Sequence, residues 1–387
     1  MIPIGLQKKL DARIKENALR TLKPQSELVD FSSNDYLGFS KEVGIYEEAH
    51  EIVKRHDLVQ NGSTGSRLLS GNHALFASAE AKLAKTYNSE DALIFNSGYD
   101  ANVGFFSSVP GRLDTILYDE YVHASIRDGI QMSHARSIKF KHNDLDDLQY
   151  QIDKLLQLLA GHIYVVTESV FSMDGDSPDL RKMARICRRG FTHLVVDEAH
   201  AVGVLGQGYG LVEDLALSQK VLARIVTFGK AMGCHGAAVL CSEALKSYLV
   251  NFSRSLIYTT AMPPHGVATI QASHEVLGAY KNTDDPRPLE EVETLQKNIK
   301  FFKKEYEKLN LQEFFIPSET AIQSAVISGN ERVKEVSEKL KLAGFSVLPI
   351  LSPTVPAGEE RLRFCLHTYN SQEEMKTVLA LLAKFVA

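Results

Sequence analysis

Between about residues 74 and 250, segments with helical hydrophobic periodicity alternate with short runs of consecutive apolar residues. Runs such as IYVV and HLVV are typical of strands that are buried on both faces of a parallel sheet. The expected strands are residues 92–95, 115–118, 137–140, 163–167, 193–196, 224–228 and 237–241. Because these strands alternate with helices, the pattern predicts an α/β fold with a mainly parallel seven-stranded sheet.

Both ends of the chain follow other patterns. Residues 6–20 carry apolar residues at helical spacing, which predicts an amphipathic N-terminal helix. After about residue 262, a long helical stretch with a break at DDPRP (284–288) is followed by shorter segments. The expected elements there are strands at 322–327, 347–350 and 361–365 and helices at 332–343 and 372–385. This alternation predicts a smaller C-terminal α+β domain.

The length of the chain agrees with such a division. Single hydrophobic cores rarely grow beyond about 250–300 residues, and this chain has 387. We expect an N-terminal helix and arm (1–40), a large domain (41–280) and a small C-terminal domain (281–387).

Charge and cysteine content exclude several classes of function. The net charge of −5 is spread over mixed signs, with no basic stripe for nucleic acid and no Lys/Arg cluster for a membrane surface. No secretory h-region and no long apolar run occur, so we expect a cytoplasmic protein. The four cysteines form no CxxC pair and no metal-ligand spacing, so no metal site is expected.

Two familiar motifs lack their required context. DEAH at 197–200 has the letters of a helicase motif, but the chain has no GxxxxGK[ST] loop, since Gly229-Lys230 is followed by Ala231. There is also no GxSxG, the signature of an α/β-hydrolase serine. The sequence therefore favours neither a nucleotide-binding protein nor a serine hydrolase of that type.

Three candidate chemical groups follow two expected strands. Asp197 and His200 come just after HLVV, and Lys230 lies just past the next strand, in TFGKAMG. Ligands of open α/β sheets bind beyond the carboxyl ends of strands. Taken singly, these residues could be a cap, a hydrogen-bond partner and a solvated lysine. Together they suit pyridoxal phosphate (PLP), since the carboxylate can keep the pyridine protonated, the imidazole can bond the 3-oxygen and the lysine can form an imine.

A phosphate site and a ring contact can also be placed. FNSGYDANVG (95–104) follows a strand and opens a helix, where backbone N–H groups bind phosphate well, although a plain strand–helix turn is the alternative. Ser172 and Thr227 are hydroxyls near strand ends, able to bond a phosphate or ring oxygen or merely to cap. His123, expected at a helix start, could stack on the ring or lie on the surface.

Ten ordered motifs resemble the α-oxoamine synthases, PLP enzymes with fold type I, the aspartate-aminotransferase fold. The resemblance covers nearly the whole chain and implies a PLP-dependent acyltransferase. Its motifs are LDARIKENALR (10–20), FSSNDYLG (31–38), GSTGSRLLSGN (62–72), FNSGYDAN (95–102), YVHAS (121–125), TESVFSMDGD (167–176), VVDEAHAVGVLG (195–206), TFGKAMG (227–233), LIYTTAMPP (256–264) and PTVPAGEERLRF (353–364).

The resemblance implies a set of cofactor contacts. Lys230 would carry PLP as a Schiff base and later remove the substrate Cα proton, Asp197 would face the pyridine nitrogen, and His123 would stack on the ring. The further contacts implied are His200 and Ser172 at the ring oxygen, Gly98, Tyr99 and Thr227 at the phosphate, and Thr259 or Thr260 at the phosphate of the other subunit. The contact across subunits implies a homodimer with active sites at the interface.

The resemblance also implies the substrates. Arg363 would bind the amino-acid carboxylate, a planar two-point match for guanidinium. The other residues expected to line the substrate pocket are Arg20, Asn34, Glu168 and Thr354. FSSNDYLG, GSTGSRLLSGN and PTVPAGEERLR are most similar to the branch that joins L-alanine to a pimeloyl thioester, carried by coenzyme A or a carrier protein, in biotin biosynthesis. That reaction releases CO2 and a free thiol.

Other readings of the same motifs stay open. A sister synthase would use glycine with acetyl-CoA, or serine with a long acyl thioester, and shares the core motifs. An aminotransferase or aldolase of the same fold is disfavoured by PTVPAGEERLR and GSTGSRLLSGN. A non-catalytic partner subunit is disfavoured because Lys230, Asp197 and His200 are all present.

Overall fold

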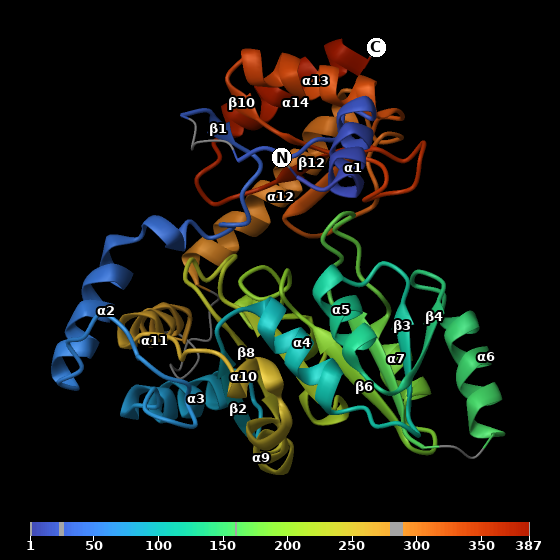
Figure 1. The fold of residues 1–387 in the computed structure, drawn as a ribbon. Coiled ribbons are helices and arrows are strands. Elements are labelled where there is room, and N and C mark those ends of the chain that lie inside the picture. Colours follow the sequence, from blue (N-terminus) through green and yellow to red (C-terminus); the bar gives the residue numbers. More distant parts are fainter. Residues whose placement is uncertain (1, 23–26, 159–160, 279–288, 387) are drawn as a thin grey trace. The chain divides into compact units, whose positions relative to one another are not determined.

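The computed structural model describes residues 2–22, 27–158, 161–278 and 289–386 (Figure 1). The chain forms two compact units. The large unit comprises Asn34–Ser172 and Asp176–Gln296, and the small unit comprises Met1–Ser33, Met173–Gly175 and Lys297–Ala387. The expected domain boundary at 280/281 and the DDPRP break lie outside the described residues, and the three-part division remains a prediction.

The large unit is built on the expected seven-stranded sheet, which is mainly parallel. The strand order is β2-β8-β7-β6-β5-β3-β4, and only β8 runs antiparallel to its neighbours. The strands are β2 (Asp91–Phe95), β3 (Thr115–Asp119), β4 (Arg136–Phe140), β5 (Ile163–Glu168), β6 (Thr192–Asp197), β7 (Ala223–Thr227) and β8 (Ala237–Cys241). Each lies within one or two residues of the segment that the apolar runs predicted, the usual uncertainty of strand ends.

Two hydrophobic cores explain why the central strands are apolar throughout. Val166 and Val195 face one core with helices α4, α5, α9 and α10, while Val165 and Val196 face the other with α6, α7 and α8. Successive side chains of a strand point to opposite faces, so a sheet covered on both sides needs apolar residues at every position. Helix α11 packs against both α2 and α3 beside this sheet (Figure 1). The helical segments of the large unit are η1 (Phe39–Lys41), α2 (Val43–Arg55), α3 (Ala74–Thr86), α4 (Gly98–Ser108), α5 (Ala124–Met132), α6 (Leu145–Leu156), α7 (Leu180–Ile186), η2 (Gly206–Gly208), α8 (Leu211–Asp214), η3 (Ser218–Lys220), α9 (Glu243–Phe252), α10 (Arg254–Ile257) and α11 (Pro264–Gly278).

A buried ion pair ties β6 to β7. Arg224 donates from Nε to Glu198 Oε2 at 2.7 Å, and both side chains are almost fully buried. The remaining guanidinium N–H groups donate to the backbone carbonyls of Tyr87 and Tyr209, so the buried charge is well satisfied. Glu198 directly follows Asp197, which means that this pair fixes the end of β6.

Replacing Arg224 by Met should lower the free energy of unfolding by about 3–5 kcal/mol, because the Glu198 carboxylate would stay buried without its cation. The surface pair Arg189–Asp153 provides the matched control, since both of its side chains are exposed. Arg189→Met should cost no more than about 1 kcal/mol. Urea unfolding of both variants measures the difference, and equal losses would contradict this role of the buried pair.

The small unit has a three-stranded antiparallel sheet with order β11-β12-β9 and a separate parallel pair, β1-β10. Helix α12 begins in the large unit and ends in the small unit. The elements are α1 (Ile4–Lys15), β1 (Val29–Asp30), α12 (Glu290–Lys308), β9 (Ile322–Val326), α13 (Asn330–Leu342), β10 (Phe345–Ser346), β11 (Leu348–Ile350), β12 (Arg361–Cys365) and α14 (Gln372–Val386). This is the α+β content that the C-terminal pattern predicted.

Helix α1 ends earlier than the hydrophobic periodicity predicted. It was expected to continue to residue 20 and stops at Lys15. Asn17 has a left-handed backbone (φ 50°), and the N–H of Ala18 bonds the carbonyl of Arg13. This is the hydrogen bond that closes a helix at a left-handed residue, and Asn tolerates that conformation well.

Among the described residues, no helix combines the length and the apolar character that a membrane crossing needs.

Candidate active site

The predicted pocket lies at the carboxyl ends of three parallel strands of the large unit. β5, β6 and β7 end at Glu168, Asp197 and Thr227, and α4 begins at Gly98 near the same edge. They enclose a cavity of about 160 Å³. It is lined by Gly98, Tyr99, Asn102, His123, Ser125, Glu168, Asp197, Ala199, His200, Ile225, Thr227 and Lys230. Crevices at this edge are where open α/β sheets bind ligands.

Lys230 is positioned by a chain of hydrogen bonds. Its Nζ lies 2.8 Å from His200 Nε2, and His200 Nδ1 lies 2.8 Å from the hydroxyl of Tyr36, which is fully buried. The Tyr36 hydroxyl donates to Asn34 Oδ1 at 3.2 Å. When the Tyr36 proton is donated to Asn34, His200 carries its own proton on Nδ1 and presents the lone pair of Nε2 to the lysine. His200 can therefore accept a proton from Lys230.

Asp197 is held by donors on both of its oxygens. Oδ1 accepts the backbone N–H of Ala199 at 2.9 Å, and Oδ2 accepts Nδ2 of Asn102 at 2.7 Å. The Asn102 amide also donates to Ser125 Oγ at 3.1 Å. Asp197 is thus an oriented, buried acceptor that suits a protonated heterocyclic nitrogen.

His123 and Glu168 meet on the other wall of the pocket. The backbone N–H of His123 donates to Glu168 Oε1 at 2.6 Å, and His123 forms the N-cap of α5, where Nδ1 accepts from the N–H of Ser125. Although part of His123 contacts solvent, desolvation of the ring lowers its pKa against the opposing charge of Asp197. Burial raises the pKa of Glu168 well above its usual range, and the charge of Asp197 raises it further. A neutral imidazole and a protonatable carboxyl therefore stand side by side.

The start of α4 offers a phosphate cradle. Ser97 caps the helix by accepting the N–H of Asp100, and the free N–H groups of the first turn include those of Gly98 and Tyr99. A Cβ built on Gly98 would lie 3.1 Å from Thr227 Oγ1, so glycine keeps the space between them open. The Tyr99 ring is half exposed and its hydroxyl donates to Asp128.

Eight of the fifteen residues singled out in the sequence line this cavity. They are Gly98, Tyr99, His123, Glu168, Asp197, His200, Thr227 and Lys230. Of the others, Asn34 connects to the pocket through Tyr36 and His200, and Ser172 is partly buried in the loop after β5. Thr259 and Thr260 lie beside Asn96, whose amide donates to Thr259 Oγ1 and to the carbonyl of Thr260.

The remaining three lie in the small unit. Arg363 is buried on β12, Thr354 is exposed in the segment between β11 and β12, and Arg20 is exposed after α1. The roles of these three residues in substrate binding remain predictions, since they belong to the small unit and the pocket belongs to the large one.

Sequence reasoning missed several residues of the pocket. Asn102, Ser125, Ala199 and Ile225 line it, and Tyr36 stands behind His200. Asn102 could have been found from its spacing, because it lies one helical turn after Gly98 on the same face of α4. Tyr36 carries no such signal, since its contact with His200 joins distant parts of the chain.

Comparison with known proteins places this chain among well-characterised folds. The profile of the family described as Aminotransferase class I and II matches residues 26–382. An 8-amino-7-oxononanoate synthase from Emericella nidulans is 39% identical over 95% of this chain and 91% of its own length. The crystal structure of an 8-amino-7-oxononanoate synthase from Francisella tularensis superposes with a TM-score of 0.76 at 30% identity, covering 93% of this chain and 98% of that one. A serine palmitoyltransferase from S. paucimobilis, solved with a bound PLP-myriocin aldimine, superposes with a TM-score of 0.86 at 23% identity, covering 99% of this chain and 96% of that one.

Proposed function

Because this chain belongs to the aminotransferase class I and II family, we propose that it condenses L-alanine with a pimeloyl thioester, releasing CO2 and a thiol. The product would be 8-amino-7-oxononanoate, a precursor of biotin. The choice of substrates is supported by the relative from Emericella nidulans, which carries that name over nearly its full length. The single observation that supports this chemistry is that Lys230, His200 and Asp197 line one pocket.

The enzyme is a PLP-dependent acyltransferase, and the donors of the pocket fit this cofactor. Lys230 would hold the aldehyde covalently, Asp197 would face the pyridine nitrogen, and His123 would lie against the ring. The first turn of α4 at Gly98, with Thr227, would hold the phosphate. Bound PLP supplies an electron sink for the pair of electrons left when a proton or CO2 leaves the substrate α-carbon.

The side chains of the pocket would then carry out the proton transfers. Lys230 would take the Cα proton of alanine, and His200 Nε2, 2.8 Å from Lys230 Nζ, can receive it. The α-carbon attacks the thioester carbonyl, and the thiolate leaves and takes up a proton. His123 can bond the carbonyl oxygen as charge develops there. Loss of CO2 and uptake of one proton at the α-carbon then give the amino ketone.

A sister reaction with glycine or serine is the alternative. The structural similarity to serine palmitoyltransferase shows a shared fold and does not choose the amino acid. The test is to incubate the purified enzyme with L-alanine, glycine and L-serine in turn, each against acetyl, pimeloyl and palmitoyl thioesters, and to identify the amino ketone by mass. We expect one product, from alanine and the pimeloyl chain. Preference for another pair would replace this proposal by the sister activity.

Replacing Arg363 by Ala should raise the KM for the amino acid by about 10²-fold and leave the KM for the thioester nearly unchanged, since a charge-assisted bidentate contact contributes about 1.5–3 kcal/mol. Arg361 on the same strand is the contrasting position, because it is already paired with Asp174 inside the small unit. Steady-state kinetics with each substrate varied in turn measure the split. A larger effect on the thioester KM would contradict the assignment of Arg363 to the carboxylate.

We further expect a homodimer in the cytoplasm, with Thr259 or Thr260 reaching the phosphate held by the partner subunit. The half-exposed Asn96–Thr259–Thr260 cluster is compatible with such a contact. Mixing an inactive Lys230→Ala subunit with an inactive Thr260→Pro subunit should restore part of the activity if sites are shared between subunits.

A further inference from the structure

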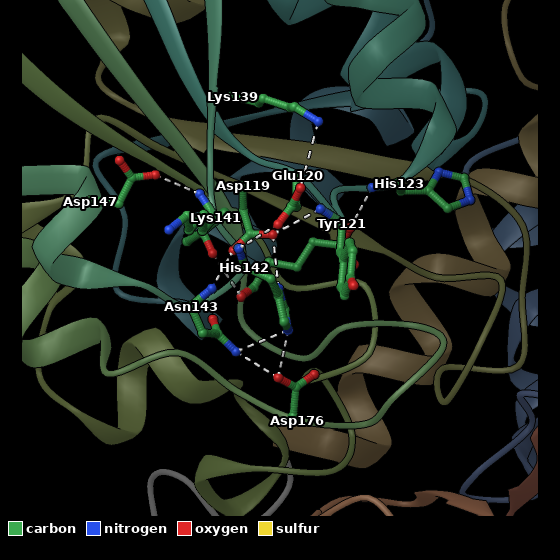
Figure 2. A network of polar contacts seen from close by, with 12 residues as sticks. Asp119, Glu120, Tyr121, His123, Lys139, Lys141, His142, Asn143, Asp147 and Asp176 are labelled. Carbon is green, nitrogen blue, oxygen red and sulfur yellow. Dashed lines mark hydrogen bonds and ion pairs between the residues drawn. The ribbon is translucent and has the colours of Figure 1, made fainter. Parts of the chain in front are cut away.

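A charged network lies next to the active site, at the carboxyl ends of β3 and β4 (Figure 2). His142 is at its centre. Its Nδ1 lies 2.9 Å from Asp119 Oδ1, and its Nε2 lies 2.8 Å from Asp176 Oδ2. Asp119 is fully buried and ends β3, while Asp176 follows the loop that leaves β5. All three residues belong to the large unit.

The geometry favours a positive charge on His142. Both ring nitrogens face carboxylate oxygens, and a neutral imidazole has only one N–H to donate. A ring that carries both protons satisfies both carboxylates, whereas a neutral ring satisfies only Asp119 and takes Asn143 Nδ2, 3.2 Å from Nε2, as a donor. Burial by itself would lower the pKa of His142, but the bonds to Asp119 and Asp176 outweigh it and raise the pKa to about 9. His142 is therefore a cation throughout the neutral range.

One end of this network holds the turn that carries His123. Asp119 Oδ1 accepts the backbone N–H of Tyr121 at 2.9 Å as well as the His142 proton. The Tyr121 ring stacks on the His142 ring, with centroids 4.4 Å apart and planes 26° apart. Two residues later, the backbone N–H of His123 donates to Glu168 Oε1 in the pocket wall. The turn is thus fixed by His142 on one side and by Glu168 on the other.

The other end holds the loop after β5. The carbonyl of Asp176 accepts the backbone N–H of Phe171 at 3.0 Å, and the Phe171 ring meets His142 edge-on at 4.5 Å. Asn143, in a left-handed conformation with φ 54°, also donates to Asp176 Oδ2. This loop starts directly after Glu168, the acceptor for His123. His142 therefore joins the two segments that set the distance between His123 and Glu168.

We propose that His142 is a positioning residue, a cationic clamp between Asp119 and Asp176 that places the His123 ring over the reacting atoms. It touches neither cofactor nor substrate and acts through His123. The inference rests on the proposed function, because there His123 lies against the ring of the cofactor, and that ring must be held in place when Lys230 removes the Cα proton.

The test is a double-mutant cycle read on the exchange of the Cα proton of L-alanine for deuterium, which needs no acyl thioester. His142→Gln removes the charge and one of the two donors, and should slow exchange by about 10- to 100-fold, the range expected when a reacting group is misplaced by an ångström or less. In a His123→Ala background, the same change should slow exchange by less than about twofold, since the ring through which His142 acts has been removed. The cofactor absorbance should stay unchanged in His142→Gln.

His162→Gln is the matched control. His162 precedes β5 at the end opposite Glu168, where it contacts His193. It should leave exchange unchanged in both backgrounds. If His142→Gln does not fold, Asp176→Asn takes its place in the cycle, because it removes the charge at Nε2 while keeping the shape of the side chain.

Two failures can be told apart. Wild-type enzyme that exchanges none of L-alanine, glycine and L-serine would overturn the proposed function and this inference with it. Normal exchange by the wild type, combined with losses that multiply in the double variant, would overturn the positioning role alone.

Discussion

Replacing Lys230 by Ala is expected to reduce turnover by about 10³-fold or more and to remove the visible absorbance that a lysine-bound cofactor gives. The variant loses both the covalent attachment and the base, and removal of a covalent catalytic group has effects of this size. The His200 ring should remain in place, because Tyr36 and not Lys230 fixes its Nδ1. Absorbance spectra and steady-state rates measure the two losses separately.

Lys230→Arg separates charge from covalent chemistry. Arginine keeps a cation near His200 but does not lose its proton in proteins, so it cannot form the imine. It should be as inactive as the alanine variant. Lys220→Ala, an exposed lysine of η3 on the segment leading to β7, is the control and should behave as wild type. Retained absorbance of a lysine adduct in Lys230→Ala would refute the assignment of this residue.

Asp197→Asn is expected to leave the cofactor bound and to cut turnover by about 10²–10³-fold, as loss of a preorganised charge in a buried site does. The carboxylate accepts from Asn102 and from the N–H of Ala199. An asparagine at position 197 would turn its own N–H2 group toward either the Asn102 amide or the Ala199 N–H, and two donors cannot form a hydrogen bond. The substitution therefore changes both the charge and one hydrogen bond, and a second variant is needed to separate them.

The swap Asn102→Asp with Asp197→Asn makes this separation. It restores the hydrogen bond between the two side chains and moves the negative charge onto α4. Activity should stay low in the swap if the charge must face the ring nitrogen. Recovery to near wild-type turnover would show that the hydrogen bond alone matters. Asp153→Asn, a surface carboxylate paired with Arg189, controls for the substitution itself.

The strands could be predicted from the sequence because their burial requires it. Val165, Val166, Val195 and Val196 are apolar in succession since both faces of the sheet are covered. The direction of β8 could not be predicted, because a run such as AAVLC has the same pattern in a parallel or an antiparallel strand. The end of α1 was also missed, since it depends on the left-handed conformation of Asn17 rather than on hydrophobic periodicity.

The pocket was predictable to the extent that strand ends mark it. Asp197 ends β6, Lys230 lies just past β7 and His123 caps α5, so local pattern and family resemblance together indicated them. Contacts between segments that are distant in the sequence could not be predicted. Tyr36 reaches His200 from far along the chain, and His142 joins two loops that no periodicity connects. Both are polar or aromatic residues whose sequence context equally suits an ordinary surface position.

The antiparallel direction of β8 has a consequence for Lys230. Because β7 and β8 pair side by side, with Thr227 opposite Ala237, Lys230 stands in the loop of a β-hairpin whose two ends are tied together. The N–H of Phe228 bonds the carbonyl of Gly236, the N–H of Gly233 bonds the carbonyl of Lys230, and a Cβ on Gly233 would lie 2.3 Å from the backbone of Ser40. An inserted or deleted residue here would either move the amine or shift β8 by one position, turning its core-facing side chains to the other face. The pairing of β7 with β8 therefore fixes the length of this loop.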